Sequence, residues 1–158
     1  MPLQIRGHDF LKSCFSFNFS CSDDGYMWCV PIKILTSNND VIEVLLENKE
    51  TIVTLENMKE DDWFKVNSGC VGYYRVHYRD EQDLNRLKPA IENKILGEVD
   101  RLSLIDDIFA LVQAGKAETT DALELIKAFK TSETSYVVWS SILNCLSKLR
   151  IIIGKYLK

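Results

Sequence analysis

The chain has 158 residues, a formal net charge of −4, 46% hydrophobic residues and 27% charged residues. These values are typical of a soluble globular protein with one domain or two small ones, and they exclude the basic excess of a nucleic-acid-binding protein. Divided after Arg79, the first part carries 8 basic and 11 acidic residues and the second part 11 and 12. Neither part is polarised, and we therefore predict no nucleic acid and no electrostatic partner.

No stretch reaches the roughly 18 uninterrupted apolar residues that a membrane span needs. The tail from Ile142 to Leu157 is apolar, but Lys148, Arg150 and Lys155 interrupt it, and we interpret it as a helix that packs on a partner surface. The five cysteines include no C-x-x-C pair, and the N-terminus has no charged-then-apolar signal segment. We therefore expect reduced thiols, no membrane span and a cytoplasmic location.

Short strands separated by turns are predicted in the first half of the chain. Phenylalanines alternate with polar residues over 14–20, which predicts a strand that a turn at 22–25 follows. A second strand is predicted over 28–35, where Pro31 indicates an edge strand or one unpaired position, because proline has no N–H to donate. Further strands are predicted over 41–46, 51–55 and 62–67, with turns at 37–40 and 47–50.

The stretch 66–78 predicts one more strand, with aromatic residues along it. Its alternation would place Cys70, Gly72, Tyr74, Val76 and Tyr78 on one face. Because glycine weakens a strand, Gly69 and Gly72 indicate a bulge or a close approach of another backbone.

From Asp80 onward the hydrophobic residues recur at helical spacing. The first predicted helix begins at an Asp80 N-cap and ends at Gly97, and Pro89 should kink or split it. Its predicted buried face carries Leu84, Leu87, Ile91 and Ile95. The second helix is predicted over 98–114, with Gly115 as its C′ residue and its stripe made of Leu102, Leu104, Ile105, Ile108, Phe109, Leu111 and Val112.

Two more helices complete the predicted order. Thr119 or Thr120 should cap the third, which carries Leu123, Ile126, Ala128 and Phe129. The fourth should begin near 132–135 and carry Tyr136, Trp139, Ile142, Leu143, Leu146 and Leu149. Strands followed by helices predict an α+β fold. We divide it into an antiparallel β-sandwich domain over 1–79 and an α-helical, α-solenoid-like segment over 80–158.

Four motifs in series resemble those of the zinc aminopeptidases related to puromycin-sensitive aminopeptidase and aminopeptidase N. Residues 28–32 are similar to W-x-V-P-I, and Trp63 to Asn67 resembles W-x-K-x-N. Residues 67–78 follow as N-x-G-x-x-G-Y-Y-R-V-x-Y, and residues 100–111 resemble D-R-x-x-L-x-x-D-x-F-x-L. The resemblance implies that 1–79 is the family's β-sandwich domain and that 80–158 is the start of its helical C-terminal domain, cut short.

The family's zinc chemistry depends on motifs that this sequence lacks. The resemblance implies an H-E-x-x-H pair with a downstream Glu to hold zinc, and a G-A-M-E-N stretch to bind the peptide's α-amine. This chain has only His8 and His77, and neither is followed by Glu. We therefore predict no catalytic, cofactor-binding or metal-binding residue here, no activity of the chain on its own, and zinc only in the full-length family.

Several residues invite a functional interpretation that we set beside a structural one. His77 is expected at a surface or interface, His8 in solvent, and Cys14, Cys21 and Cys29 as packed or free thiols, because their spacing fits no zinc pattern. Asp106 and Asp107 diverge by about 100° on a helix, so one should bond Arg101 or Lys116 and the other should be solvated. We expect Arg75 in an ion pair, and Trp28, Tyr73, Tyr74 and Tyr78 in a sandwich core and rim.

Three functions remain open at this point. The first is a non-catalytic fragment or truncated relative of a zinc aminopeptidase, acting as scaffold or as part of the wall of a peptide chamber. The second is a stand-alone interaction module that binds a peptide or a catalytic domain of the same family. The third, catalysis by this chain alone, lacks a visible metal set or nucleophile–base pair.

Overall fold

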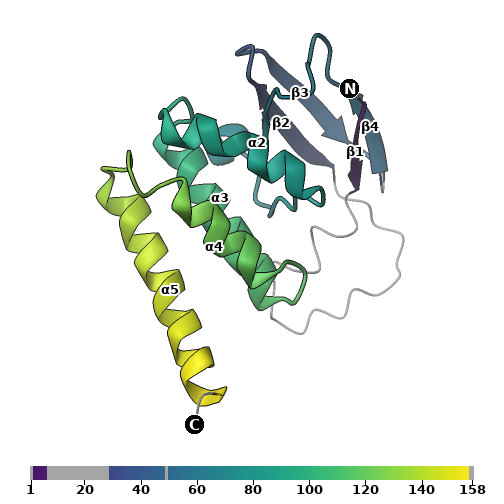
Figure 1. The fold of residues 1–158 in the computed structure, drawn as a ribbon. Helices are drawn as coiled ribbons and strands as arrows, with labels where there is room; N and C mark the ends of the chain where they lie inside the picture. The colour runs from purple at the N-terminus through teal and green to yellow at the C-terminus, as the bar shows by residue number, and fades with distance from the viewer. Residues whose placement is uncertain (1, 7–28, 49, 157–158) are drawn as a thin grey trace. The chain divides into compact units, whose positions relative to one another are not determined.

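The computed structural model describes residues 2–6, 29–48 and 50–156 and divides the chain into two compact units, Met1–Leu87 and Lys88–Lys158 (Figure 1). Strands precede helices along the chain, so the predicted α+β class is confirmed. The predicted division into a β-sandwich over 1–79 and a helical segment over 80–158 stays a prediction. No helix in the described residues is long and apolar enough to cross a membrane.

The strands of the described residues all lie in the first unit, in two antiparallel sheets. One sheet has the order β3-β2-β5 and the other pairs β1 with β4. Figure 1 shows β2 beside β3 and β1 beside β4. The bounds are β1 Pro2–Arg6, β2 Val30–Thr36, β3 Val41–Leu46, β4 Glu50–Thr54 and β5 Phe64–Val66. The described parts of the strands predicted over 28–35, 41–46, 51–55 and 62–67 are therefore confirmed.

The turn between β2 and β3 closes as predicted at 37–40. The amide of Thr36 donates to the carbonyl of Asp40 at 3.0 Å, and Asn39 has a φ of 65°. Asparagine tolerates this left-handed conformation better than most residues, which explains its place in the turn. Pro31 lies on β2 outside the stretch Ile34–Thr36 that pairs with β5, so on that side the missing N–H breaks no ladder between described strands.

A hydrophobic core in the described part of the first unit takes side chains from both sheets. Ile32 and Ile34 of β2 are 3% and 0% exposed, whereas Pro31 between Val30 and Ile32 is exposed, because successive strand residues point to opposite faces. The buried members of this core are Ile32, Ile34, Leu46, Val53, Leu55, Phe64, Val66, Tyr74 and Val76.

Two strand predictions fail or fall outside the described residues. The stretch 66–78 is not a strand: after Val66 it forms a short 3-10 turn, η1 Ser68–Cys70, and then an irregular segment that bends at 72–74. The alternation of burial nevertheless holds within it, since Tyr74 and Val76 are 7% and 5% exposed and Tyr73 is 86% exposed. The strand predicted over 14–20 and the turn at 22–25 lie outside the described residues, and β1 was not predicted.

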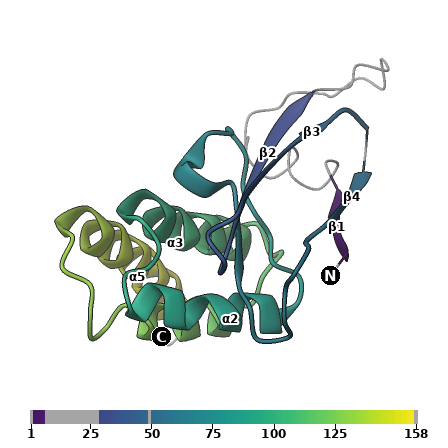
Figure 2. The same cartoon turned by 90° about the horizontal axis from the view of Figure 1, so that it is seen from above.

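Four α-helices follow, with bounds α2 Glu81–Glu92, α3 Glu98–Gln113, α4 Thr119–Lys127 and α5 Tyr136–Tyr156. In the second unit α3 contacts both α4 and α5, and Figure 2 shows α3 and α5 side by side. Asp80 caps α2 as predicted, because its Oδ1 accepts the amide of Gln82 at 2.9 Å. At the end of α3, Gly115 has a φ of 67° and Lys116 donates to Leu111 at 2.8 Å, which is the Schellman arrangement.

The helix predictions need several corrections. Pro89 does not split α2, which continues to Glu92. Because α2 ends there, Ile95 lies beyond it and is 60% exposed, and Leu96 is buried in its place. Thr119 is the first residue of α4 and makes no cap, since the N-cap position is Glu118. Leu123, Tyr136 and Leu143 are 41%, 84% and 59% exposed, whereas Ala122, Leu125, Val138 and Cys145 are buried.

Candidate functional site

The described residues contain no group of three or more His, Cys, Asp or Glu side chains that could hold a metal ion. His77 is half-buried in the irregular segment after η1. Cys29 is an exposed free thiol, while His8, Cys14 and Cys21 lie outside the described residues. A zinc centre therefore does not fit the described residues.

The aromatic residues of the 66–78 stretch serve the core rather than a common binding patch. The hydroxyl of Tyr78 accepts the amide of Val66 at 3.0 Å, and its ring centroid lies 5.9 Å from that of Phe64. Tyr74 is buried, but Tyr73 points to solvent and is 86% exposed. The predicted place in a core and rim is thus confirmed for Tyr74 within the core and for Tyr78 packed against it, Tyr73 lies at the surface, and Trp28 lies outside the described residues.

A clasp made by Asn67 organises the loop that follows β5. Its Nδ2 donates to the carbonyl of Gly72 at 2.9 Å, and its Oδ1 accepts the amide of Gly72 at 2.9 Å. The chain between the two residues turns sharply, because Asn67, Gly69 and Cys70 have φ values of 58°, 72° and 53°. This left-handed geometry explains why the stretch leaves the β-sheet after Val66.

Gly72 is required at its position by a close approach. A Cβ atom there would lie 2.0 Å from the ring of Tyr74, far inside van der Waals contact. The clasped loop therefore keeps the Tyr74 ring over its own backbone and holds Val71 and Tyr73 in solvent, 59% and 86% exposed. The glycines thus mark a tight loop and a close approach, rather than a bulge in a strand.

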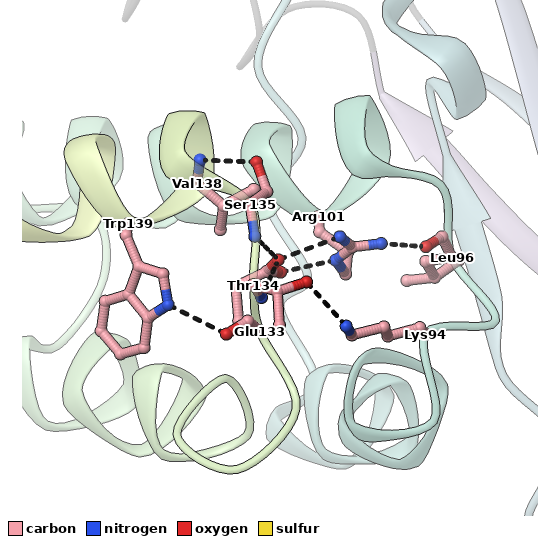
Figure 3. A network of polar contacts seen from close by, with 8 residues as sticks. All are labelled: Lys94, Leu96, Arg101, Glu133, Thr134, Ser135, Val138 and Trp139. Carbon is pink, nitrogen blue, oxygen red and sulfur yellow. Dashed lines mark hydrogen bonds and ion pairs between the residues drawn. The ribbon is translucent and has the colours of Figure 1, made fainter.

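The best-connected polar site of the second unit surrounds the Glu133 carboxylate (Figure 3). Arg101 donates from Nε to Oε2 at 2.7 Å and from Nη2 to Oε1 at 3.1 Å. The amides of Thr134 and Ser135 donate to Oε1 at 2.9 and 2.7 Å. Arg101 and Glu133 are only 7% and 9% exposed, so this is a buried, bidentate ion pair whose acid also binds the two amides that directly precede α5.

The same network ties the start of α3 and the turn before it to the turn before α5, which is distant in sequence. Arg101 donates from Nη1 to the carbonyl of Leu96 at 2.6 Å, and Lys94 donates to the Thr134 hydroxyl at 2.9 Å. The indole of Trp139 donates to the carbonyl of Glu133 at 3.1 Å. The turn before α3, the first turn of α3 and the turn before α5 are therefore held in one arrangement, as the dashed lines of Figure 3 show.

The charge of the network is fixed by its surroundings. The hydrogen bonds from Arg101, and then those from the amides of Ser135 and Thr134, hold the pKa of Glu133 below its ordinary value of 4.5, although burial acts in the opposite direction. Glu133 is therefore ionised at neutral pH and cannot act there as a general acid. This arrangement can stabilise structure, and it offers no reactive group.

The two adjacent aspartates differ in part from the prediction, in which one of them bonds Arg101 or Lys116; the bond to Lys116 stays a prediction. The hydroxyl of Ser141 donates to Oδ1 of Asp106 at 2.5 Å, linking α5 to α3. Asp107 is 5% exposed rather than solvated, and Arg101 bonds Glu133 instead of either aspartate.

Burial and the nearby charge of Asp106 raise the pKa of the Cys145 thiol, so this cysteine stays protonated and is a weak nucleophile.

Comparison with known proteins assigns the chain to a protein family. The profile of a family described as the ERAP1-like C-terminal domain matches residues 63–156. The chain belongs to this family. The match begins at Trp63 and ends at Tyr156, so it contains both the Asn67 clasp and the Arg101–Glu133 ion pair.

The relatives are named aminopeptidases, and all are far longer. Puromycin-sensitive aminopeptidase of Caenorhabditis elegans is 36% identical over 125 residues, which cover 77% of this chain and 13% of the relative. Endoplasmic reticulum aminopeptidase 1 of Homo sapiens is 38% identical over 106 residues, covering 65% of this chain and 11% of the relative. Aminopeptidase M1-A of Oryza sativa is 37% identical over 123 residues. The chain thus spans about an eighth of the length of the relatives it matches, and the predicted kinship with aminopeptidases is confirmed.

The sequence alone did not single out the two sites that the family region contains. Asn67 stood inside the N-x-G-x-x-G motif, and the glycine spacing was the signal that a tight loop follows it. Glu133 gave only the weak signal of an acid just before the N-terminus of a helix. Its pairing with Arg101, 32 positions earlier, leaves no periodic trace in the sequence.

Proposed function

We propose that this chain is a non-catalytic part of an aminopeptidase-family protein, acting as scaffold and as part of the wall of a peptide chamber. One observation supports this above the others: the matched region belongs to a domain named for its C-terminal position, and its best-built polar site is a saturated structural ion pair. A buried carboxylate that accepts bonds from a guanidinium and two amides stiffens the fold and has no capacity left for a substrate.

The finer features of this proposal follow from the family resemblance. We infer that the two sheets of the first unit belong to a β-sandwich and that the helices of the second unit belong to an α-solenoid-like domain. Zinc and the peptide-binding residues would lie in other parts of a full-length relative, so this chain contributes no metal ligand and no activity by itself. The odd cysteine count and exposed Cys29 and Cys70 favour a reducing, cytoplasmic location.

A chimera tests the scaffold role. The 125-residue region of the worm puromycin-sensitive aminopeptidase that aligns with this chain is replaced by the corresponding part of this chain, and hydrolysis of an aminoacyl fluorogenic substrate is measured. We expect a folded chimera that retains the activity of the worm enzyme.

Two variants of the chimera test whether its activity depends on the Arg101–Glu133 ion pair. Arg101→Ala in the chimera should lower both its melting temperature and its activity, because the buried Glu133 loses its partner. Lys130→Ala, at an exposed position of the same unit, should change neither. A chimera that is folded but inactive, or one whose activity is indifferent to Arg101→Ala, contradicts the proposal.

A second candidate function is a stand-alone module that binds another protein. The observation that favours it is the set of exposed apolar side chains on α5, which include Tyr136, Leu143 and Ile151 at 84%, 59% and 63% exposure. Solvent-facing apolar side chains on one helix are a common mark of a protein–protein contact. Leu143→Asp places a charge on this face, and loss of partner binding in that variant is the test.

A further inference from the structure

We draw no further inference here: the strongest candidate, the surface patch of Val71 and Tyr73 on the loop after β5 that the Asn67 clasp holds, carries nothing because nothing in the described part of the structure shows what covers it.

Discussion

The structure allows an estimate of how much unfolding free energy is lost when the Arg101–Glu133 ion pair is broken. Glu133→Ala leaves a guanidinium that is 7% exposed without its carboxylate, and it removes the acceptor of the amides of Thr134 and Ser135. Removing one partner of a buried ion pair costs about 3–5 kcal/mol. A domain has only about 5–15 kcal/mol of stability in total, so the second unit of this variant should be close to unfolding at room temperature.

The assay is urea denaturation followed by far-UV circular dichroism, with tryptophan fluorescence as a second probe, since the Trp139 indole donates to Glu133 at 3.1 Å. With an m-value near 1.5 kcal/mol per molar, a loss of about 3 kcal/mol lowers the midpoint by about 2 M. The two units can unfold separately, so we assign the shift to the transition that both probes report.

A double-mutant cycle separates the ion pair from its surroundings. Arg101→Met combined with Glu133→Leu removes both charges, and the loss should be smaller than the sum of the single losses by about 1–3 kcal/mol, because no charge is left buried alone. Lys127→Ala, which breaks the exposed pair with Glu124, is the matched control and should give no measurable shift. If Arg101→Ala and Glu133→Ala unfold at the wild-type midpoint, the network does not hold the helices together.

Further predictions concern pH, the loop and metal. Because the pKa of Glu133 is lowered by folding, its stabilisation is complete above its ordinary value of 4.5 and is lost as the pH falls through the folded value; acid unfolding should be less steep in Glu133→Gln. Gly72→Ala should destabilise the first unit by about 1–3 kcal/mol through the clash with Tyr74, whereas Gly97→Ala, with no atom nearer than 4.0 Å, should be nearly neutral by melting temperature. Treatment with a chelator should leave the melting temperature unchanged, and a drop would reveal a structural metal.

Periodicity predicted the elements whose stability comes from one buried face. The alternation of Val30, Ile32 and Ile34 placed β2, and the helical spacing of Leu104, Ile105 and Ile108 placed α3, because in both cases the same side chains that repeat in sequence are buried in the fold. Burial alternates in the same way at Tyr74 and Val76, yet no strand forms there.

The sequence pattern could not predict left-handed backbone conformations or ion pairs between residues that are far apart in the sequence. The strand predicted over 66–78 does not form because Asn67 adopts a φ of 58° and makes two hydrogen bonds to Gly72. A pattern of hydrophobic residues does not predict this backbone conformation. Arg101 was expected to bond an aspartate beside it but pairs with Glu133, which the turn between α4 and α5 brings back to the first turn of α3. The partner of a buried charge depends on tertiary structure, which sequence spacing does not reveal.

Hydrolysis of aminoacyl fluorogenic substrates by the purified chain, measured with added zinc and with a chelator, tests the non-catalytic role most directly. We predict no hydrolysis above the buffer blank under either condition, with the worm puromycin-sensitive aminopeptidase as the positive control. Hydrolysis by the chain that zinc restores and the chelator abolishes would contradict the scaffold proposal.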